Sequence, residues 1–317
     1  MQIDYCLILA AGFGTRMGSI GKKLPKVLWP VFEKSLLELQ VAYAKSLGIK
    51  KIFINLHHMG EEIELYCKGK EAFEGVQFLW EAPEILDIGG AIHNLASLKE
   101  VSYKGKLLVL NADQFFYLSK AEIEKYLEGF NHSPCMLFSY WVESNLGYNA
   151  LEISSERVVR SIIKNKDLTL NSKVETYTGI AIVELSLLMK KHGPSAFFES
   201  VCDFKKNEIK AILLKDVDYW DFGTLKRYWE TSFRILETYK VNSNHPFLRF
   251  LVASRALKTW KINLQQIAYN SSVPRVINLT PDSIMEEINP SIILCPSNYK
   301  KLKGQWIWWN SLNEEIT

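Results

Sequence analysis

Apolar runs of strand length alternate with stretches of helical periodicity through the first half of the chain. This order predicts an α/β fold with a doubly wound, mostly parallel, Rossmann-like sheet. Ligands bind such a sheet at the carboxyl ends of its strands, where the strand order reverses. We therefore expect the functional residues to follow the strands directly. The predicted strands are 5–10, 52–56, 76–80 and 107–110, and the predicted helices are 36–47, 60–67, 89–98 and one that begins after Ser119.

The pattern changes after Cys135. Short alternating runs predict a small antiparallel excursion, and the chain then returns to the sheet before a long helix that begins at Thr224. Near the end, a helix opening at His245-Pro246 is followed by short runs broken by proline and glycine, without a sustained repeat. We divide the chain into a domain of residues 1–240 and a helical or irregular appendage of residues 241–317. The predicted strands of this half are 136–142, 149–153, 158–163 and 212–214.

The composition narrows the classes of partner. Hydrophobic residues make up 48% of the 317 residues, enough for a sizeable core, and the net charge is +3. This charge is too small to argue for nucleic acid or a membrane, and no apolar stretch reaches the ~18 residues of a membrane helix. The five cysteines are scattered and form no C-x-x-C pair. We expect a protein of the reducing cytoplasm with no nucleic-acid and no membrane partner.

The most informative segment follows the first apolar run. Gly12 and Gly14 lack side chains, so the backbone N–H groups around them can surround an anionic oxygen. Arg16 and Lys26 add the positive charge that a triphosphate or pyrophosphate requires. Neither the dinucleotide fingerprint nor a G-x-x-x-x-G-K-[ST] run is present. The segment predicts a phosphate-binding loop, and the alternative is a tight turn flanked by surface cations.

Five segments resemble, in the same order, those of the nucleotidyltransferase family that makes nucleotide sugars. Members of that family join a sugar 1-phosphate to a nucleoside triphosphate and release pyrophosphate. A single segment would be weak support, but five in order, spanning residues 1 to about 228, are strong. The segments are LAAGFGTRM (9–17) with LPKVL (24–28), ILDIGGA (85–91), VLNAD (109–113), YTGI (177–180) and WDFGT (220–224).

The resemblance implies a role for residues in each segment. Asp113 and Asp221 would hold a catalytic Mg²⁺, although a lone aspartate at either place would be taken for a helix cap or turn residue. Arg16 would hold the β- and γ-phosphates, and Lys26 would neutralise the α-phosphate as the second catalytic cation. The implied nucleotide-binding residues are Leu9, Ala10, Ala11, Gly12, Gly14, Thr15, Glu81, Gly89 and Gly90. The implied sugar-binding residues are Asn149, Lys164, Thr178 and Gly179, with Lys166 as a rival to Lys164.

Within the family, the chain most resembles the N-acetylmuramate-1-phosphate uridylyltransferases and the mannose-1-phosphate guanylyltransferases, through residues 55–58 and the LDxGG segment. Three departures stand out: Ala112 replaces a glycine before the first aspartate, residues 18–23 replace the family's R-P-L-T run, and the usual Glu-Lys pair before the sugar site has no evident counterpart. We expect UTP and an N-acetylated hexose or muramate phosphate as substrates, ahead of GTP and mannose phosphate.

Two other functions share parts of this pattern. A cytidylyltransferase acting on phosphocholine or another alcohol phosphate would need an aromatic cage, for which Tyr140, Trp141, Tyr148 and Tyr177 are candidates. A non-catalytic, nucleotide-sugar-binding regulatory protein would have lost Lys26 or one of the two aspartates, and this chain keeps all three.

Two further clusters have a simpler interpretation. His57 and His58 are adjacent and would point to opposite faces of a strand, so we expect a structural role or a place in the nucleoside loop instead of a zinc site. Trp306, Trp308 and Trp309 are expected to pack the appendage onto the main domain. A subunit contact is the alternative for these tryptophans, which leaves a homo-oligomer open.

Overall fold

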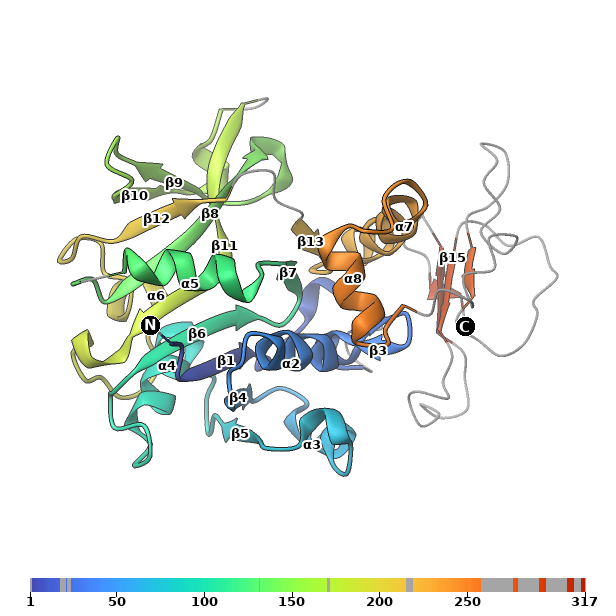
Figure 1. Ribbon diagram of the computed structural model, residues 1–317, viewed down its shortest axis with the longest axis horizontal. Coiled ribbons are helices and arrows are strands. Elements are labelled where there is room, and N and C mark those ends of the chain that lie inside the picture. Colours follow the sequence, from blue (N-terminus) through green and yellow to red (C-terminus); the bar gives the residue numbers. More distant parts are fainter. Residues whose placement is uncertain are drawn as a thin grey trace. The chain divides into compact units, whose positions relative to one another are not determined.

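The computed structural model describes residues 2–17, 21, 24–130, 132–169, 172–214 and 219–257, together with short strands at 276–278, 291–294, 307–310 and 315–316 (Figure 1). Two compact units make up the chain, and each is built from several segments. The first unit comprises Met1–Gly12, Tyr43–Ala112 and Leu118–Tyr219, and the second comprises Phe13–Ala42, Asp113–Tyr117 and Trp220–Thr317.

A seven-stranded sheet forms the centre of the first unit. Its strands pair in parallel except β11, which runs antiparallel to both of its neighbours. The order reverses at β1, because β4 and β5 follow on one side of it and β6 on the other. This arrangement confirms the predicted α/β fold with a mostly parallel sheet. In spatial order the strands are β12 (Lys210–Leu213), β8 (Cys135–Glu143), β11 (Lys173–Glu184), β6 (Lys106–Asn111), β1 (Tyr5–Leu9), β4 (Lys51–Leu56) and β5 (Val76–Trp80).

Helices follow the strands in the expected alternation. Ile92 and Leu95 of α4 pack with Leu7 and Phe53 of the sheet in one continuous core, and all four are fully buried. The apolar periodicity of the sequence thus marks the faces that are removed from water. The α-helices up to this point are α2 (Leu36–Ser46), which contributes to both units, α3 (Gly60–Cys67), α4 (Asp87–Ser97), α5 (Lys120–Glu128) and α6 (Phe197–Ser200). Short 3₁₀ turns are η1 (Thr15–Met17), η2 (Lys26–Leu28), η3 (Glu71–Phe73), η4 (Ser144–Leu146), η5 (Asn165–Asp167) and η6 (Leu185–Leu187).

Capping boxes begin two of the predicted helices, α5 and α2. Ser119 Oγ accepts a hydrogen bond from Glu122 N at 3.3 Å, and the Glu122 carboxylate accepts one from Ser119 N. Ser35 and Glu38 make the same reciprocal pair before α2, at 3.1 and 2.9 Å. These bonds satisfy donors that the first turn of a helix leaves without partners, which explains why the two helices begin there.

A two-stranded hairpin lies where the antiparallel excursion was expected, but the expected strand 136–142 belongs to the main sheet as β8. Strands β9 (Ala150–Ile153) and β10 (Val159–Ile163) pair antiparallel and form a sheet of their own. The chain then returns to the main sheet through β11, which pairs antiparallel with β6 and β8, and β12 later adds to the sheet in parallel with β8.

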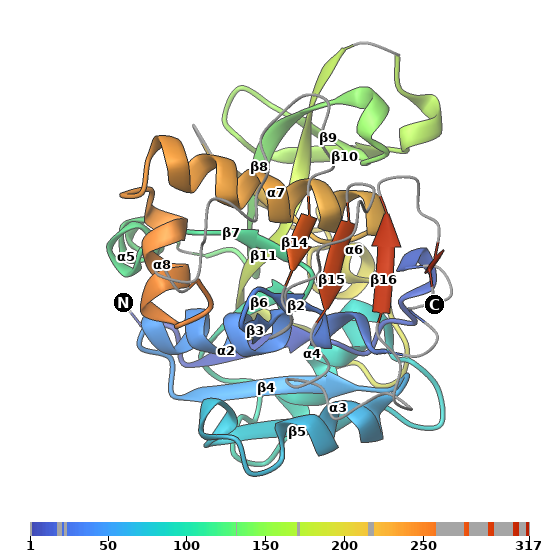
Figure 2. The ribbon, with the colours of Figure 1, turned by 90° about the vertical axis from the view of Figure 1, so that its right-hand side faces the viewer.

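The second unit is organised around aromatic side chains. Strand β7 (Gln114–Phe116) pairs with β13 (Tyr219–Asp221), and β2 (Pro30–Val31) pairs with β3 (Lys34–Ser35). Helix α7 (Leu225–Val241) begins after Thr224 as predicted, and α8 (Pro246–Ala253) runs on from its end at a steep angle (Figure 2). Phe247 of α8 stacks on Trp220 with ring centroids 4.8 Å apart and lies 5.6 Å from the ring of Phe115.

Beyond α8, the described residues form one small sheet. It contains β14 (Val276–Asn278), β15 (Ser291–Leu294), β16 (Ile307–Asn310) and β17 (Glu315–Ile316), of which β14 and β15 are parallel. The expected tryptophan contact, at Trp306, Trp308 and Trp309, lies outside the side chains that the structure describes. The division of the chain after residue 240 stays a prediction. Among the described residues, no helix is long and apolar enough to cross a membrane.

Candidate active site

The two aspartates predicted as metal ligands lie on paired segments of the second unit. Asp113 directly precedes β7, and Asp221 is the last residue of β13. Phe222 N donates a hydrogen bond of 2.9 Å to Asp113 O. This backbone bond joins the two segments directly beside the two aspartates. The pairing of β7 with β13 explains how residues 108 positions apart in the sequence come to be neighbours.

Lys26 connects this pair of segments. Its ammonium group forms an ion pair with the Asp113 carboxylate and donates a hydrogen bond of 2.8 Å to Gly223 O. The side chain is only 11% exposed, so Lys26 is not the surface cation of the alternative interpretation. Because the lysine and the carboxylate are both partly removed from water, their attraction is screened less than at an exposed site.

Gly223 leaves a space that three charged groups share. A Cβ atom at this residue would lie 2.7 Å from Asp221 Oδ1, 3.5 Å from Asp113 Oδ2 and 3.6 Å from Lys26 Nζ. Both carboxylates therefore face the same small volume, and the absence of a side chain at Gly223 keeps it open. The structure thus explains why the WDFGT segment has a glycine at residue 223.

Arg227 is a site residue that the sequence did not reveal. Its Nη1 donates a hydrogen bond of 2.8 Å to Asp221 Oδ2, while Asp221 Oδ1 accepts one of 2.6 Å from Gly223 N. Thr224 Oγ1 caps α7 by accepting a hydrogen bond from Arg227 N at 3.2 Å, which fixes the arginine in the first turn. A positive charge in the first turn of a helix interacts unfavourably with the helix dipole. An arginine at this place therefore indicates a specific anionic partner, and this is the signal in the sequence that could have revealed it.

The glycine loop is open in the part that the structure describes. Nothing lies within 4 Å of a Cβ atom built on Gly12, so its backbone is accessible to a ligand. Gly14 has φ of +62°, a conformation that favours glycine. Thr15 and Arg16 are exposed in η1. Of the departing run at residues 18–23, only residue 21 is among those described. The phosphate contacts of this loop stay predictions.

A buried relay holds the backbone before the loop in the first unit. Asn55 Oδ1 accepts a hydrogen bond of 2.7 Å from Ala10 N, and Asn55 Nδ2 donates one of 2.8 Å to Glu81 Oε1. The second oxygen of Glu81 accepts a hydrogen bond of 2.8 Å from Leu86 N. Glu81 is 2% exposed, so the structure gives its carboxylate the role of fixing the loops. The same holds for His57, whose Nδ1 lies 2.9 Å from Glu81 O.

Leu9 and Ala11 are placed by the sheet and its edge. Leu9 ends β1 opposite Asn55 and Asn111, and its carbonyl accepts a hydrogen bond of 3.4 Å from Ala112 N. Ala11 is buried beside Ala10. Their carboxyl-end position agrees with the expectation for a doubly wound sheet, while their contact with a nucleotide stays a prediction.

Gly89 and Gly90 lie against a neighbouring segment of the first unit. A Cβ atom on Gly89 would lie 2.6 Å from Ser195 O, and one on Gly90 would lie 2.7 Å from Gly193 O. Gly90 N also donates a hydrogen bond of 3.1 Å to Ser195 O. Both residues therefore lack side chains because the segment before α6 packs against α4, which begins at Asp87 instead of at Gly89. A nucleobase contact by these glycines stays a prediction.

The candidate sugar-binding residues lie on the hairpin side of the first unit. Asn149 is exposed and its Oδ1 accepts a hydrogen bond of 3.0 Å from Asn165 N, which anchors the turn that carries Lys164 and Lys166. Both lysines are exposed, so the structure does not separate them. Thr178 is 1% exposed, and its hydroxyl accepts a hydrogen bond of 3.1 Å from Ile180 N.

Gly179 marks an irregularity in strand β11. Its φ is +82°, and the register between β11 and β8 shifts between Tyr177 and Ala181. Such a bulge turns the following backbone and explains why a glycine is needed there. Sugar contacts by Thr178 and Gly179 stay predictions.

The four residues proposed for an aromatic cage separate into different surroundings. Tyr177 stacks on Phe197 in the core, with ring centroids 5.7 Å apart, and burial raises the pKa of its hydroxyl well above the ordinary value. Trp141 is 55% exposed. Tyr140 and Tyr148 both meet Tyr219, at 4.8 and 6.2 Å between ring centroids. Tyr140 and Tyr148 pack against Tyr219, whereas Tyr177 packs in the core, so the four residues do not form the expected cage.

A family comparison agrees with this geometry. The model of the MobA-like NTP transferase domain matches residues 6–167. The chain belongs to this NTP transferase family. The matched residues include the glycine loop, Lys26 and Asp113. The other segment of the site, Asp221 to Arg227, follows the matched residues in the chain.

Individual relatives and solved structures point the same way. A D-glycero-alpha-D-manno-heptose 1-phosphate guanylyltransferase of Campylobacter jejuni is 35% identical over 227 residues, which are 70% of this chain and 96% of that enzyme. The bifunctional protein GlmU of a Synechococcus species is 30% identical over 177 residues, 55% of this chain but 37% of that protein. The crystal structure of HddC from Yersinia pseudotuberculosis shares the fold, with a TM-score of 0.60, 23% identity, and 73% of this chain and 99% of that chain covered.

The donor set of this NTP transferase fits a Mg²⁺ ion. Asp113 and Asp221 offer hard oxygen ligands toward the space beside Gly223, and Mg²⁺ completes its coordination with waters and substrate phosphates. Among the described residues, no cluster of three histidine, cysteine or acidic side chains could hold a metal without such help. A metal at this place would thus need ligands from the substrate.

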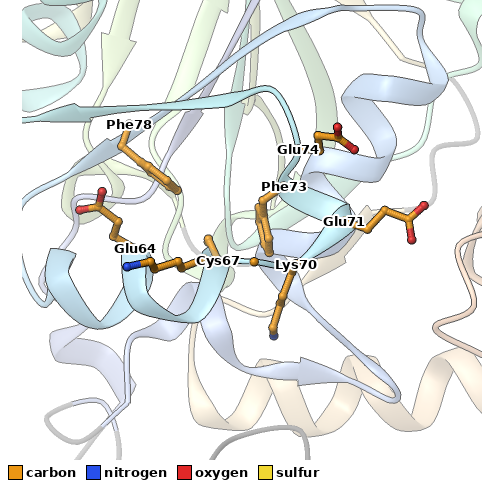
Figure 3. A pocket seen from close by; sticks show the side chains of 9 residues that line it. Glu64, Cys67, Lys70, Glu71, Phe73, Glu74 and Phe78 are labelled. Atoms are coloured by element: carbon orange, nitrogen blue, oxygen red, sulfur yellow. The ribbon is translucent and has the colours of Figure 1, made fainter.

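A pocket of about 640 Å³ in the first unit takes no part in the predicted site. It lies between α3, η3 and β5, with Phe73 and Phe78 as its aromatic part (Figure 3). None of the residues predicted to bind nucleotide, sugar or metal lines it. The lining residues are Glu64, Cys67, Lys68, Gly69, Lys70, Glu71, Phe73, Glu74 and Phe78.

Proposed function

We propose that this NTP transferase joins a nucleoside triphosphate to a sugar 1-phosphate and releases pyrophosphate. The observation that carries the proposal is the grouping of Lys26, Asp113 and Asp221 around Gly223. A relative that is 35% identical along most of its length is a sugar 1-phosphate guanylyltransferase, which supports the same chemistry here.

In the proposed reaction, an oxygen of the sugar phosphate attacks the α-phosphorus of the triphosphate, and the bond to the pyrophosphate oxygen breaks. Two polyanions must meet, so the main tasks are alignment and neutralisation of charge. Lys26 is partly buried and fixed by Asp113 and Gly223, so it would offer a positioned positive charge to the reacting phosphate. Arg16 is exposed beside the open glycine loop and would bind the departing pyrophosphate.

A Mg²⁺ ion held by Asp113 and Asp221 would supply a Lewis acid that neutralises phosphate charge. Arg227 and Gly223 N hold the Asp221 carboxylate in one orientation for this purpose. Because Thr231 Oγ1 also donates a hydrogen bond of 2.7 Å to Asp221 O, the backbone of this ligand is fixed as well.

For the nucleobase, we propose GTP ahead of UTP. The sequence pattern alone led us to expect UTP, but the relative with 35% identity is a guanylyltransferase. The acceptor would be the 1-phosphate of a heptose or hexose. The cytoplasmic location and self-association through residues 241–317 stay predictions.

Two rival functions have less support. The phosphocholine cytidylyltransferase needs an aromatic cage, and Tyr177 lies in the core away from that role. The non-catalytic regulatory protein would not need a lysine and two carboxylates in one network, and this chain has them.

The test is release of pyrophosphate from GTP, UTP, CTP and ATP, each paired with several sugar 1-phosphates and with phosphocholine, in Mg²⁺ and in EDTA. We expect release that needs Mg²⁺, one triphosphate and one sugar phosphate. Release with phosphocholine and CTP alone would establish the rival transferase. Tight nucleotide binding without release from any pair would establish the regulatory protein.

A further inference from the structure

Each carboxylate that faces Gly223 is already paired with a cation from the second unit. Asp113 forms an ion pair with Lys26, and Asp221 Oδ2 accepts a hydrogen bond from Arg227 Nη1 at 2.8 Å. The two negative and two positive charges cancel. A free divalent cation would therefore meet a set of groups with no net attraction for it.

Arg227 is held in this place by the start of α7. Its N–H is bound by Thr224 Oγ1, and its side chain is only 24% exposed. The first turn of α7 contains no acidic residue, and a positive charge there is unfavourable toward the helix dipole. The ion pair with Asp221 offsets this unfavourable contribution.

Asp221 has little freedom to leave this arginine. Its Oδ1 is bound by Gly223 N, its carbonyl by the Thr231 hydroxyl, and its side chain is 7% exposed. A metal ion that reaches Asp221 without other ligands must therefore approach a guanidinium group at close range. Such a repulsion between cations is strong where water is partly excluded.

We propose that Arg227 is a positioning residue that makes metal binding depend on the triphosphate. It orients Asp221 and cancels its charge, so that free metal binds weakly. A bound triphosphate adds several negative charges, so the net charge of the site becomes negative and the metal ion can bind. This inference rests on the proposed function, because it takes the triphosphate as the ligand, and it adds the order in which the ligands bind.

The direct test is uptake of Mn²⁺ by the full-length protein, followed as the loss of the free Mn²⁺ signal in electron paramagnetic resonance. Titrations are run with no nucleotide, with GTP and with UTP, each repeated without protein so that the Mn²⁺ bound by free nucleotide is subtracted, and without sugar phosphate so that no reaction follows. The variant is Arg227→Gln, and the matched control is Lys226→Gln. Lys226 is the neighbouring residue, its side chain is 72% exposed, and it pairs with Glu230 at 3.9 Å, so the control removes the same charge from the solvent face.

We expect the wild type and Lys226→Gln to bind Mn²⁺ at least about tenfold more tightly with a triphosphate than without one. Arg227→Gln should bind Mn²⁺ without nucleotide at least about tenfold more tightly than the wild type. Adding Asp221→Asn to Arg227→Gln should abolish this gain, which locates it at the carboxylate. Loss of a merely structural ion pair would weaken metal binding and would not produce a gain.

Two results would overturn the proposal: equal nucleotide-free uptake by the wild type and Arg227→Gln, or tight uptake by the wild type without nucleotide. If circular dichroism shows that Arg227→Gln does not fold, Arg227→Lys replaces it. A lysine keeps the cation, so wild-type nucleotide dependence in Arg227→Lys supports the proposal, and nucleotide-free binding by it contradicts the proposal. Failure to form a nucleotide sugar with the Mn²⁺ pattern intact would instead contradict the proposed function alone.

Discussion

At the scale of single residues, a methyl group at Gly223 would take the space that Lys26, Asp113 and Asp221 share. The added Cβ would lie 2.7 Å from Asp221 Oδ1, closer than such atoms approach one another. Because Asp221 is bound on both carboxylate oxygens, it can move away only by breaking those hydrogen bonds. The substitution therefore displaces a predicted metal ligand directly.

We expect Gly223→Ala to lower kcat/KM at least about 100-fold, as displacement of a reacting or binding group by about 1 Å does. The variant should also lose about 1–3 kcal/mol of unfolding free energy, because the buried Asp221 carboxylate can make room only by breaking a hydrogen bond. Gly129→Ala is the matched control, because the nearest atom to its added Cβ is Tyr126 O at 3.8 Å. Full activity of Gly223→Ala would show that the space beside this residue is not used.

The roles of Lys26, Asp113 and Asp221 stay predictions, but residue type and order were sufficient to expect these residues in one site. They were insufficient for Glu81 and Gly89, because their surroundings come from segments distant in the sequence. Glu81 fixes loops through Asn55, and Gly89 gives room to Ser195 O. A carboxylate or a glycine in a motif does not by itself tell whether a ligand or a neighbouring segment occupies the adjacent space.

At the scale of elements, the start of α7 combines a stabilising cap with the positioning of Arg227. Removing the hydroxyl in Thr224→Ala should cost about 1 kcal/mol of unfolding free energy, as for other N-caps. It should also lower kcat/KM about tenfold, because the backbone that carries Arg227 is loosened.

The control for this variant is Ser119→Ala, which removes the corresponding cap of α5. Ser119→Ala should lose a similar unfolding free energy in a denaturant titration and keep its kcat/KM. Equal effects of the two variants on kcat/KM would mean that the cap of α7 contributes stability alone.

Helix α4 carries a histidine that links stability to pH. His93 Nδ1 lies 3.0 Å from the Tyr103 hydroxyl, its Nε2 donates to Ser200 O at 3.2 Å, and burial lowers its pKa below the ordinary 6.5. Between the lowered pKa and 6.5 the unfolded chain binds a proton that the folded chain does not. Stability should therefore be fully present above about pH 6.5 and fall as the pH drops below it.

This pH dependence is measured as the midpoint temperature of thermal unfolding, at pH values from about 7.5 down to about 5.5. The drop should be smaller in His93→Gln than in the wild type. His132→Asn changes an exposed histidine that is not among the groups acting on His93, and it should keep the wild-type slope. Equal slopes in all three proteins would contradict a buried neutral His93.

The elements themselves were largely predictable, because their signals are local. Both capping boxes mark helix starts, and the apolar runs mark β1, β4, β5 and β6. The short strands β7 and β13 had no such signal, since a pair of three-residue strands carries too little periodicity. Yet this pair brings Asp113 and Asp221 together, so the geometry of the site depended on the least predictable part of the fold.

At the scale of the whole molecule, the chain passes repeatedly between its two units. The second unit takes residues from the loop after β1, from Asp113–Tyr117 and from the part beginning at Trp220. A linear division of the sequence cannot express this, because composition changes gradually along a chain while contacts join distant segments. Phe247 of α8 is fully buried against Trp220 and Phe115, so α8 belongs to the unit that carries the carboxylates.

The family membership and the Gly223 site together make nucleotidyl transfer the central claim. Its most direct measurement is ³¹P nuclear magnetic resonance of the full-length protein with Mg²⁺, GTP or UTP and a sugar 1-phosphate, with Asp113→Asn as the paired sample. We predict that the triphosphate and sugar-phosphate signals decline together while a diphosphate ester and free pyrophosphate appear in equal amounts, at least about 100-fold more slowly in Asp113→Asn. Release of inorganic phosphate with an unchanged sugar-phosphate signal, or equal rates in the two proteins, would contradict the account.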